Sequence, residues 1–346
     1  MKNILVVGAG FAGATVAREL AEAGHNVHVI DQRDHIAGNA HESLYKIDED
    51  PNTYIKYHTY GPHLFHTKNK VVWDYLSKFT EWTSYKHKVK ALLEDGRYVT
   101  LPVNKETKEI VGEENIVDIF YRPYTRKMWN LDIDQLDPSV RNRVAIRDDM
   151  NEFYFPDDTY QALPKHGYNF LISNMLHHPN ITIELNTEYQ SRMAEFYDHI
   201  FTSQSIDTFF CSMYGELEYI GMHFEHQLVH LNSVLPATTV NFTHSLKHTR
   251  VTEWKNLPNH HRNCNHHTLL TYEIPLRYGH NLKYYPVKDP DGINKAKFDR
   301  YKLEAEKIKD RVTFIGRCGN YVYINMDQAV NMSLSVVRKY LNGNTT

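Results

Sequence analysis

The sequence predicts an α/β fold: a Rossmann-like nucleotide-binding domain built from both ends of the chain, with a helical insert and an antiparallel β-sheet domain between them. Three observations support this prediction. A glycine-rich turn joins two short strand-like stretches at the N-terminus, a strand–glycine–helix pattern returns near the C-terminus, and helical and strand-like stretches fill the middle. With 346 residues the chain is long enough for two or three domains of about 100–200 residues each.

The N-terminal element is predicted to be a βαβ unit. Residues 2–7 and 26–30 have the composition of short buried parallel strands, and residues 14–24 have the spacing of a helix. Asp31 follows the second strand directly, where a carboxylate can accept hydrogen bonds from ribose hydroxyls. Glycines in the turn permit a sharp bend and a close pyrophosphate, and the helix N-terminus favours phosphate. The predicted dinucleotide-binding turn comprises Gly8, Gly10, Phe11, Ala12 and Gly13.

Two further features favour FAD as the dinucleotide. A strand-like stretch at residues 311–315 runs into a glycine turn and a helical stretch at residues 326–340, which is the topology of FAD-binding Rossmann proteins. Arg317 in that turn can meet the second side of the pyrophosphate. No second GxGxxG is present, so we expect no separate NAD(P)H domain. A basic residue and a small-residue turn after the second strand are also frequent in FAD proteins; the positions concerned are Gln32, Arg33, Gly38 and Asn39.

The middle of the chain mixes both kinds of element. Helical spacing is found at residues 70–79, 111–128 (interrupted by Pro123) and 169–176. Strand-like stretches are found at residues 90–103, 181–185, 199–202, 217–241 and 268–274. The expected domains are an FAD-binding domain of residues 1–70, about 185–225 and 305–346, a helical insert of about 70–150, and an antiparallel sheet domain of about 150–185 and 225–305.

Composition excludes several classes of function. Lys and Arg number 39 against 42 Asp and Glu, so the net charge of −3 draws the chain neither to nucleic acid nor to an anionic membrane. No stretch approaches the roughly 18 uncharged apolar residues of a membrane-spanning helix. Cys211, Cys264 and Cys318 are far apart, which argues against a disulfide scaffold. We therefore expect a cytoplasmic protein that neither binds nucleic acid nor inserts into a membrane.

Several local patterns follow one another in order along nearly the whole chain. They are HIAGN at 35–39, YGPHLFHT at 60–67, YTRKMW at 124–129, YQALPKHGY at 160–168, TRVTE at 249–253, YYP at 284–286 and GRCGNYVYINMD at 316–327. In this combination the chain resembles the UDP-galactopyranose mutase family, flavoenzymes that interconvert the six- and five-membered ring forms of UDP-galactose. The resemblance extends from residue 2 to about residue 340.

The resemblance implies a redox-neutral isomerase that requires reduced FAD. In the family, flavin N5 attacks the anomeric carbon and displaces UDP, the ring opens through an iminium ion and recloses through another hydroxyl, and UDP returns. A missing NAD(P)H domain agrees with this chemistry and implies an external reductant. The family further implies a homodimer, a nucleotide-sugar substrate and a role in cell-surface polysaccharide biosynthesis.

The resemblance also implies roles for individual residues. Two arginines, Arg143 and Arg250, match diphosphate ligands, since paired guanidinium groups can hold a departing diphosphate. Tyr285 and Tyr323 match tyrosines that bind the same phosphates, and His63 matches a histidine beside the flavin, with Asp327 also on the cofactor side. The expected substrate contacts are Tyr124, Trp129, Arg143, Tyr154, Asn241, Arg250, Tyr285 and Tyr323.

Two assignments stay open on the sequence alone. Arg147 competes with Arg143 for the phosphate, although spacing from Trp129 favours Arg143. Tyr321 and Tyr323 lie on the same side of an extended segment, so either could face the ligand.

The histidine-rich segment at residues 260–267 invites a metal site, but it lacks the spacing of a known ligand set. We expect a solvated loop there and no metal. No GxSxG elbow is present either.

The sequence departs from the family pattern in two places, which leaves the sugar and the base open. Ala37 stands where the family generally has a second glycine, and residues 214–220 lack arginines that many members carry. The substrate could therefore be UDP-galactose, UDP-N-acetylgalactosamine, UDP-arabinose or a TDP-linked 6-deoxysugar. Two functions of other classes compete: an amine-oxidase-like flavin oxidoreductase, and a flavin-binding protein without catalysis.

Overall fold

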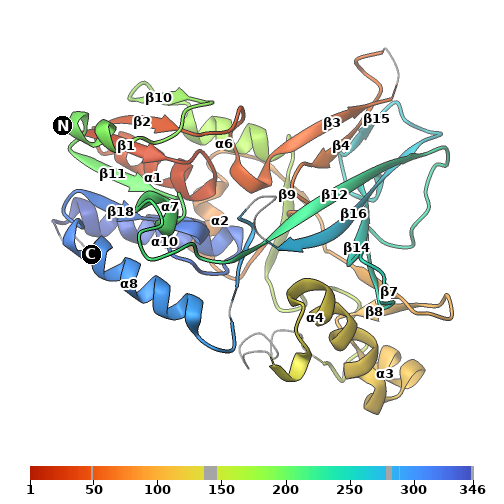
Figure 1. The fold of residues 1–346 in the computed structure, drawn as a ribbon. Coiled ribbons are helices and arrows are strands. Elements are labelled where there is room, and N and C mark those ends of the chain that lie inside the picture. The colour runs from red at the N-terminus through yellow and green to blue at the C-terminus, as the bar shows by residue number, and fades with distance from the viewer. Residues whose placement is uncertain (48–49, 136–145, 278–282, 288, 344–346) are drawn as a thin grey trace.

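The structure is a computed structural model that describes residues 1–47, 50–135, 146–277, 283–287 and 289–343. Its α/β architecture confirms the predicted fold class. A parallel sheet with its helices lies on one side of the molecule and a larger, mainly antiparallel sheet on the other, with a group of helices below the larger sheet (Figure 1).

The parallel sheet combines strands from both predicted ends of the nucleotide-binding part with two strands from the middle of the chain. Its strands are, in spatial order, β10 (Ile181–Glu184), β2 (Asn26–Ile30), β1 (Asn3–Val7), β11 (His199–Thr202) and β18 (Val312–Phe314). Of the two middle strands, β10 lies in a segment expected to belong to the antiparallel sheet domain. All four neighbouring pairs are parallel. The central strand β1 is buried from Ile4 onward, because helices or loops cover both faces of the sheet.

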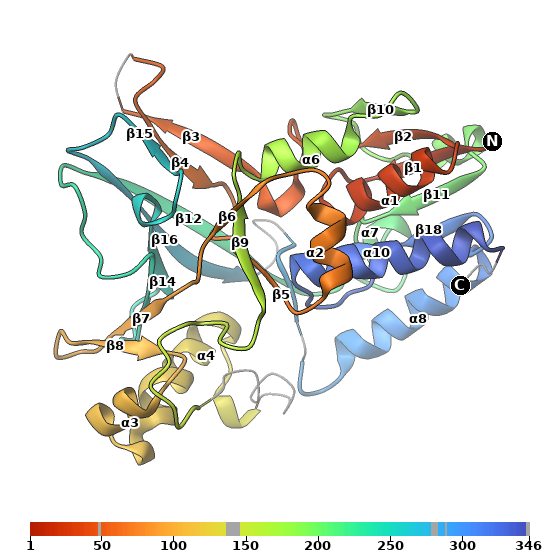
Figure 2. The ribbon, with the colours of Figure 1, turned by 180° about the vertical axis from the view of Figure 1, so that it is seen from behind.

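One face of this sheet carries most of the helices. Helices α1 (Phe11–Glu22) and α10 (Met326–Leu341) pack side by side, as Figure 2 shows, and share the main hydrophobic core with α2 (Lys70–Leu76) and α6 (Tyr168–Leu176). Helices α7 (Ile206–Phe209) and α8 (Ile293–Lys307) pack against each other nearby. The Asn325 side chain caps α10 in a capping box with Gln328, which satisfies two helix-end groups. The short helix α9 (Gly316–Gly319) precedes α10 in the chain.

The larger sheet has seven strands. In spatial order they are β17 (Tyr285–Pro286), β12 (Tyr219–Val229), β16 (Thr268–Arg277), β14 (Arg250–Glu253), β13 (Thr239–Phe242), β7 (Val89–Leu92) and β8 (Tyr98–Leu101). Neighbours are antiparallel except β13 and β7. Two of its strands, β7 and β8, come from the segment expected to be a helical insert. The domain boundaries themselves stay a prediction.

Two three-stranded sheets connect these parts. One consists of β15 (His261–Arg262), β4 (Tyr54–His58) and β3 (Glu42–Lys46); the other of β5 (Phe65–Thr67), β9 (Tyr160–Pro164) and β6 (Trp82–Ser84). Neither sheet was predicted. The remaining short helices are η1 (Gly38–Ala40), η5 (Ser191–Phe196) and η6 (Trp254–Asn256).

The helical group below the larger sheet begins with α3 (Lys105–Val111). It continues through η2 (Glu113–Asn115), a π-helical turn η3 (Val117–Tyr121), α4 (Arg122–Trp129) and η4 (Ile133–Gln135). Ile116 and Phe120 pack on β7 and β8, which joins the group to the sheet.

Two expected elements were wrong in extent. The helix expected at residues 111–128 is divided, because Gly112 ends α3 at φ 81° and Pro123 lies in the first turn of α4. The strand-like stretch at residues 217–241 is two strands. Between them, the backbone N–H groups of Val234 and Leu235 donate to the Glu253 carboxylate instead of to a neighbouring strand.

Within the described ranges, no helix combines the length and apolarity that crossing a membrane requires.

Candidate active site

A cavity of about 400 Å³ lies between the larger sheet, α4 and the segment that leads from α9 into α10. Ten of the predicted site residues line it, although they come from widely separated segments. They are His63, Tyr124, Trp129, Tyr154, Asn241, Arg250, Tyr285, Arg317, Tyr323 and Asp327. Arg143 lies outside the described residues.

Several buried polar atoms on the cavity wall have no hydrogen-bond partner among the described residues. They include the Tyr121 hydroxyl, Asn241 Oδ1 and Asp327 Oδ1. Because a buried polar group without a partner costs about 1–3 kcal/mol, such atoms mark where a polar ligand would bind.

Arg250 is the cation that the larger sheet contributes to this wall. It lies on β14 directly opposite Glu273 of β16, with Nε 3.4 Å from Glu273 Oε2. Its Nη2 donates to the Tyr124 hydroxyl at 3.1 Å, which links the sheet to α4. Burial raises the pKa of the Glu273 carboxyl, and the charge of Arg250 opposes that rise. Glu273 was missed from the sequence, because its position opposite Arg250 depends on strand register.

Tyr285 and Tyr323 form a second part of the wall. Their rings stack with centroids 5.3 Å apart. Arg317 holds them: its guanidinium lies 5.0 Å from the Tyr323 ring centroid and donates to the carbonyls of Tyr284 (3.0 Å) and Ile324 (2.7 Å), the residues next to the two tyrosines. Arg317 was predicted as a pyrophosphate contact; in this structure it lines the cavity and supports the tyrosines, and its contact with a cofactor stays a prediction.

The structure distinguishes Tyr323 from Tyr321. Tyr323 lines the cavity, whereas the Tyr321 hydroxyl donates to the carbonyls of Glu218 (2.7 Å) and Val287 (2.8 Å). Tyr321 also packs in a separate hydrophobic cluster with Tyr219. The geometry therefore favours Tyr323 as the ligand contact and gives Tyr321 a structural role.

Lys127 fastens α4 to the larger sheet. Its Nζ donates to the carbonyls of Phe242 (2.8 Å), His244 (2.9 Å) and His248 (3.0 Å), in the turn between β13 and β14. Burial lowers the pKa of this ammonium to about 8. The lysine thereby holds the helix that carries Tyr124 against the strand that carries Arg250. The sequence did not indicate this role.

His63 faces the cavity as a neutral imidazole. Burial lowers its pKa to about 4. Its Nδ1 lies 2.8 Å from the Gly61 carbonyl oxygen, which can only accept, so Nδ1 carries the proton and Nε2 is an acceptor. His66, which also lines the cavity, pairs with Asp158 at 2.5 Å and stacks on Phe155.

The predicted dinucleotide turn has the form that such a ligand requires. A Cβ on Gly13 would lie 1.8 Å from the Gly8 carbonyl oxygen, so only glycine lets α1 pack this closely on the turn. Gly10 begins α1 without a side-chain cap and no acid occupies the first turn, which leaves that helix end available to a phosphate. Phe11 and Ala12 follow as the first helical residues and are buried.

Asp31 and the residues after it complete this cradle. The Asp31 carboxylate accepts the N–H groups of Ala9 (2.8 Å) and Arg33 (3.0 Å) and is nine-tenths buried. Arg33 donates to Asn39 Oδ1 at 2.9 Å, while Gln32 is exposed. These residues fit a dinucleotide.

The departure at Ala37 is accommodated. Ala37 adopts φ 72° and its N–H donates to the Ala9 carbonyl at 2.9 Å, which brings Gly38 against Gly10. An alanine in this left-handed conformation costs about 1 kcal/mol relative to glycine.

Arg147 does not line the cavity. It donates to the backbone carbonyls of Phe153 (3.0 Å), Asn151 (2.9 Å) and Pro102 (3.4 Å). These bonds hold the segment leading to Tyr154, so Arg147 has a structural role. The geometry gives no support to Arg147 as the phosphate ligand.

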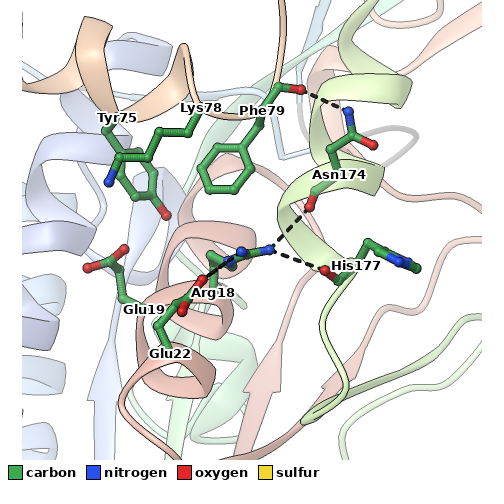
Figure 3. A pocket seen from close by; sticks show the side chains of 8 residues that line it. All are labelled: Arg18, Glu19, Glu22, Tyr75, Lys78, Phe79, Asn174 and His177. Atoms are coloured by element: carbon green, nitrogen blue, oxygen red, sulfur yellow. Dashed lines mark hydrogen bonds and ion pairs between the residues drawn. The ribbon is translucent and has the colours of Figure 1, made fainter.

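A second hollow, shown in Figure 3, lies on the outer side of α1 where it meets α2 and α6. Arg18 is central there, but its donors are already used by Glu22 and by the carbonyls of Asn174 and His177. The Asn174 amide donates in turn to the Phe79 carbonyl. This hollow is a junction between three helices and is separate from the cavity of the candidate active site.

A Rossmann-type cradle in the same chain as a cavity with arginines, stacked tyrosines and buried polar atoms without a partner is typical of enzymes that bind a dinucleotide and act on an anionic ligand. Residues 6–79 match the model of the NAD(P)-binding Rossmann-like domain, and residues 119–323 match the model of UDP-galactopyranose mutase. The chain belongs to the UDP-galactopyranose mutase family and is an isomerase acting on a nucleotide sugar.

Individual relatives agree with this assignment. The chain is 31% identical to a probable UDP-galactopyranose mutase of Klebsiella pneumoniae, over 98% of this chain and 95% of the relative. It is 29% identical to the dTDP-fucopyranose mutase of Escherichia coli, over 99% of this chain and 100% of the relative. The fold is similar to that of a reduced UDP-galactopyranose mutase, with a TM-score of 0.76, 16% identity and coverage of 100% and 95% of the two chains.

Proposed function

We propose that the enzyme binds FAD noncovalently and interconverts the pyranose and furanose forms of UDP-galactose. The observation that carries this proposal is the content of one cavity: Arg250, Tyr285 and Tyr323 for a diphosphate, with Tyr124 and Trp129 for a flat base. Guanidinium and phenol groups are strong donors to phosphate oxygens, and aromatic rings stack on bases.

When reduced FAD is bound, its N5 supplies the nucleophile that displaces the diphosphate from the anomeric carbon. The protein's task is to hold the departing diphosphate for its return. Arg250 offers a charge already oriented by Glu273, so little reorganisation is needed as negative charge develops. Burial raises the pKa of Tyr285 well above its usual value, so it remains a phenol and a hydrogen-bond donor. The proposal assigns Arg143 as a second guanidinium on the diphosphate.

His63 contributes an acceptor to the same cavity. With Nδ1 bonded to the Gly61 carbonyl, Nε2 can accept a hydrogen bond from a ligand hydroxyl or N–H. Because the pKa of His63 is lowered to about 4, this role persists across the physiological pH range. Gly8, Gly10, Gly13 and Asp31 would bind the pyrophosphate and ribose of the cofactor.

The decisive experiment uses the purified protein reduced with dithionite. We expect a yellow protein with noncovalent FAD that converts UDP-galactofuranose to UDP-galactopyranose, detected by chromatography. Air-oxidised enzyme should be inactive, because an oxidised flavin N5 is electrophilic. A colourless protein that cannot take up FAD, or equal turnover in both redox states, would refute the proposal.

The same assay separates the competing functions. Net oxidation of substrate with stoichiometric peroxide would identify an oxidoreductase, and bound FAD without turnover would identify a noncatalytic protein. The E. coli relative acts on a dTDP-linked fucose, so dTDP-fucopyranose, UDP-N-acetylgalactosamine and UDP-arabinopyranose should be compared with UDP-galactose. The highest kcat/KM identifies the substrate.

A further inference from the structure

Three histidines from separate segments form a hydrogen-bonded chain that ends at the cavity. The backbone N–H of His63 lies 2.9 Å from His58 Nδ1, and His58 Nε2 lies 3.1 Å from His260 Nε2. His260 Nδ1 lies 2.8 Å from the Pro258 carbonyl oxygen. His58 is the last residue of β4, and His260 precedes β15, which pairs with β4.

The groups at the two ends of this hydrogen-bonded chain determine which ring nitrogen of His58 and of His260 carries the proton. A backbone N–H can only donate, so His58 Nδ1 accepts and the proton of His58 is on Nε2. A backbone carbonyl can only accept, so His260 carries its proton on Nδ1 and accepts at Nε2. His58 Nε2–H therefore donates to His260 Nε2, and all donors point away from the cavity toward Pro258.

This arrangement also decides against a metal ion at the same place. Glu42, His58 and His260 bring ligand atoms within 4.8 Å of one another and are all buried. A metal on His58 Nε2 would require the proton on Nδ1, where the N–H of His63 already points. The Lys56 ammonium lies 3.5 Å from Glu42 Oε1 and supplies the positive charge for that carboxylate.

The chain lies in the protein interior. His58 is 0% and His260 2% exposed, and the Trp254 ring packs 5.0 Å from the His58 ring. The N–H of Lys56 donates to the His260 carbonyl at 2.7 Å, which fixes the backbone at the far end. A buried polar chain in which every member has its partner is rigid, whereas losing one link strands the others.

We propose that His58 and His260 are positioning residues for His63, and that their hydrogen-bonded chain holds the turn at residues 61–63 against the cavity. The turn has little room to adjust. Gly61 adopts φ 79°, and a Cβ there would lie 2.9 Å from the Phe224 ring and 3.4 Å from Glu273 Oε1. The turn thus passes close to Glu273, the ion-pair partner of Arg250. The expected effect on kcat rests on the proposed function, whereas the hydrogen-bonded chain of histidines does not depend on it.

The test exploits the likeness between amide side chains and the two imidazole nitrogens. The Asn amide can place an acceptor near the position of Nδ1, whereas the Gln amide reaches the position of Nε2. His58→Asn keeps the acceptor for the N–H of His63, and His58→Gln does not. We expect His58→Gln and His58→Leu to lower kcat about ten- to a hundredfold, with FAD content unchanged. His58→Asn loses only the link to His260, so its activity should lie between that of the wild type and that of His58→Gln.

The far end of the chain has its own pair of variants. His260→Phe should lower kcat in the same direction, while His260→Gln, which can still accept from His58, should restore much of it. His261→Gln is the matched control, because His261 is the next residue and is exposed. Equal activity of His58→Asn and His58→Gln would overturn the proposal, as would a loss in His261→Gln as large as that in His260→Phe.

A second measurement does not depend on turnover. Histidine-selective ¹⁵N NMR of the wild-type protein, assigned with the His58 and His260 variants, should show a proton on Nε2 of His58 and on Nδ1 of His260. The opposite tautomer of His58, or stoichiometric zinc bound to the purified protein, would overturn the proposal. If these tautomers are found but the wild type shows no mutase activity, the proposed function fails while the chain is confirmed.

Discussion

Arg250 and Glu273 form an ion pair in the wall of the cavity, with Arg250 Nε 3.4 Å from Glu273 Oε2 at directly opposed positions of β14 and β16. The Glu273 side chain is 5% exposed. The pair gives Arg250 a fixed direction before any ligand binds, and Tyr124 holds one of its other nitrogens. A diphosphate therefore meets a guanidinium that has already lost much of its rotational freedom.

Replacing Arg250 should damage catalysis more than cofactor binding. We expect Arg250→Ala to lower kcat/KM about ten- to several-hundredfold, since each ~1.36 kcal/mol of lost transition-state binding is tenfold. Arg250→Lys should recover only part of this, because an ammonium cannot reproduce the planar fork. The measurements are steady-state kinetics of the reduced enzyme and FAD absorbance. Unchanged kcat/KM in Arg250→Ala would contradict the assignment.

The same variant should also lower stability, because it strands a buried carboxylate. Breaking a buried ion pair from one side costs about 3–5 kcal/mol. Adding Glu273→Gln to Arg250→Ala should restore part of the free energy of unfolding without restoring activity. Urea unfolding of the two variants measures this difference.

Replacing Arg147 and replacing Arg143 should affect different properties: protein stability for Arg147 and UDP binding for Arg143. Arg147→Ala removes bonds to three backbone carbonyls, so we expect the free energy of unfolding to fall by about 1–3 kcal/mol, with UDP affinity nearly unchanged. Arg143→Ala, at the residue assigned to the diphosphate, should weaken UDP binding. Calorimetry and UDP titration of both variants decide the matter. If Arg147→Ala alone abolished UDP binding, the phosphate assignment would move by four residues.

Gly38 should be essential for FAD retention for a steric reason. It adopts φ 56°, and a Cβ there would lie 3.0 Å from the Gly10 Cα, so Gly38→Ala should push the turn off the dinucleotide cradle and reduce bound FAD. Gly96→Ala is the matched control. Gly96 has φ 88° but no atom within 4 Å of the added Cβ, so it incurs only the backbone cost of about 1 kcal/mol. Equal FAD content in both variants would contradict this explanation.

Lowering the pH should decrease the free energy of unfolding already at pH values well above the pKa of the carboxylates. Burial lowers the pKa of His63 and His199 to about 4 and of His87 and His260 to about 3. Their unfolded pKa is about 6.5, so the stability they contribute is complete above that pH. It is lost progressively as the pH falls from about 6.5 to the folded pKa values, because over this interval the unfolded histidines bind protons and the folded ones do not. Each contributes a slope of up to about 1.4 kcal/mol per pH unit. Urea unfolding between pH 7 and pH 5 measures the slope, and a constant free energy would refute it.

Local signals in the sequence were sufficient for the nucleotide-binding part. Strand β2 was predicted with its observed bounds and β1 to within one residue, and Gly8, Gly10 and Gly13 occupy the predicted turn, because apolar strands and glycine turns depend mainly on neighbours in sequence. Arg317 was predicted from the returning turn and the other cavity residues from the family resemblance, and the structure brings ten of them together.

What the sequence could not show depends on contacts between distant segments. Glu273 is opposite Arg250 only because of strand register, and Lys127 reaches three carbonyls that only the fold brings near it. Glu253 diverts the backbone of Val234 and Leu235 from a strand that their composition favours. The tautomer of His58 likewise follows from a neighbour in the fold.

The order of strands in the parallel sheet has a consequence for biosynthesis. β1 lies between β2 and β11, and β18 forms the edge beyond β11, so the sheet joins the earliest and the latest parts of the chain. A ribosome makes β1 and α1 first, whereas β11 follows only at residues 199–202, and the edge strand β18 and helix α10, which packs on α1, follow more than a hundred residues later still. We therefore expect that the cofactor domain cannot close, and cannot load FAD, before α10 has been made. Nascent chains stalled before β18 should bind no flavin.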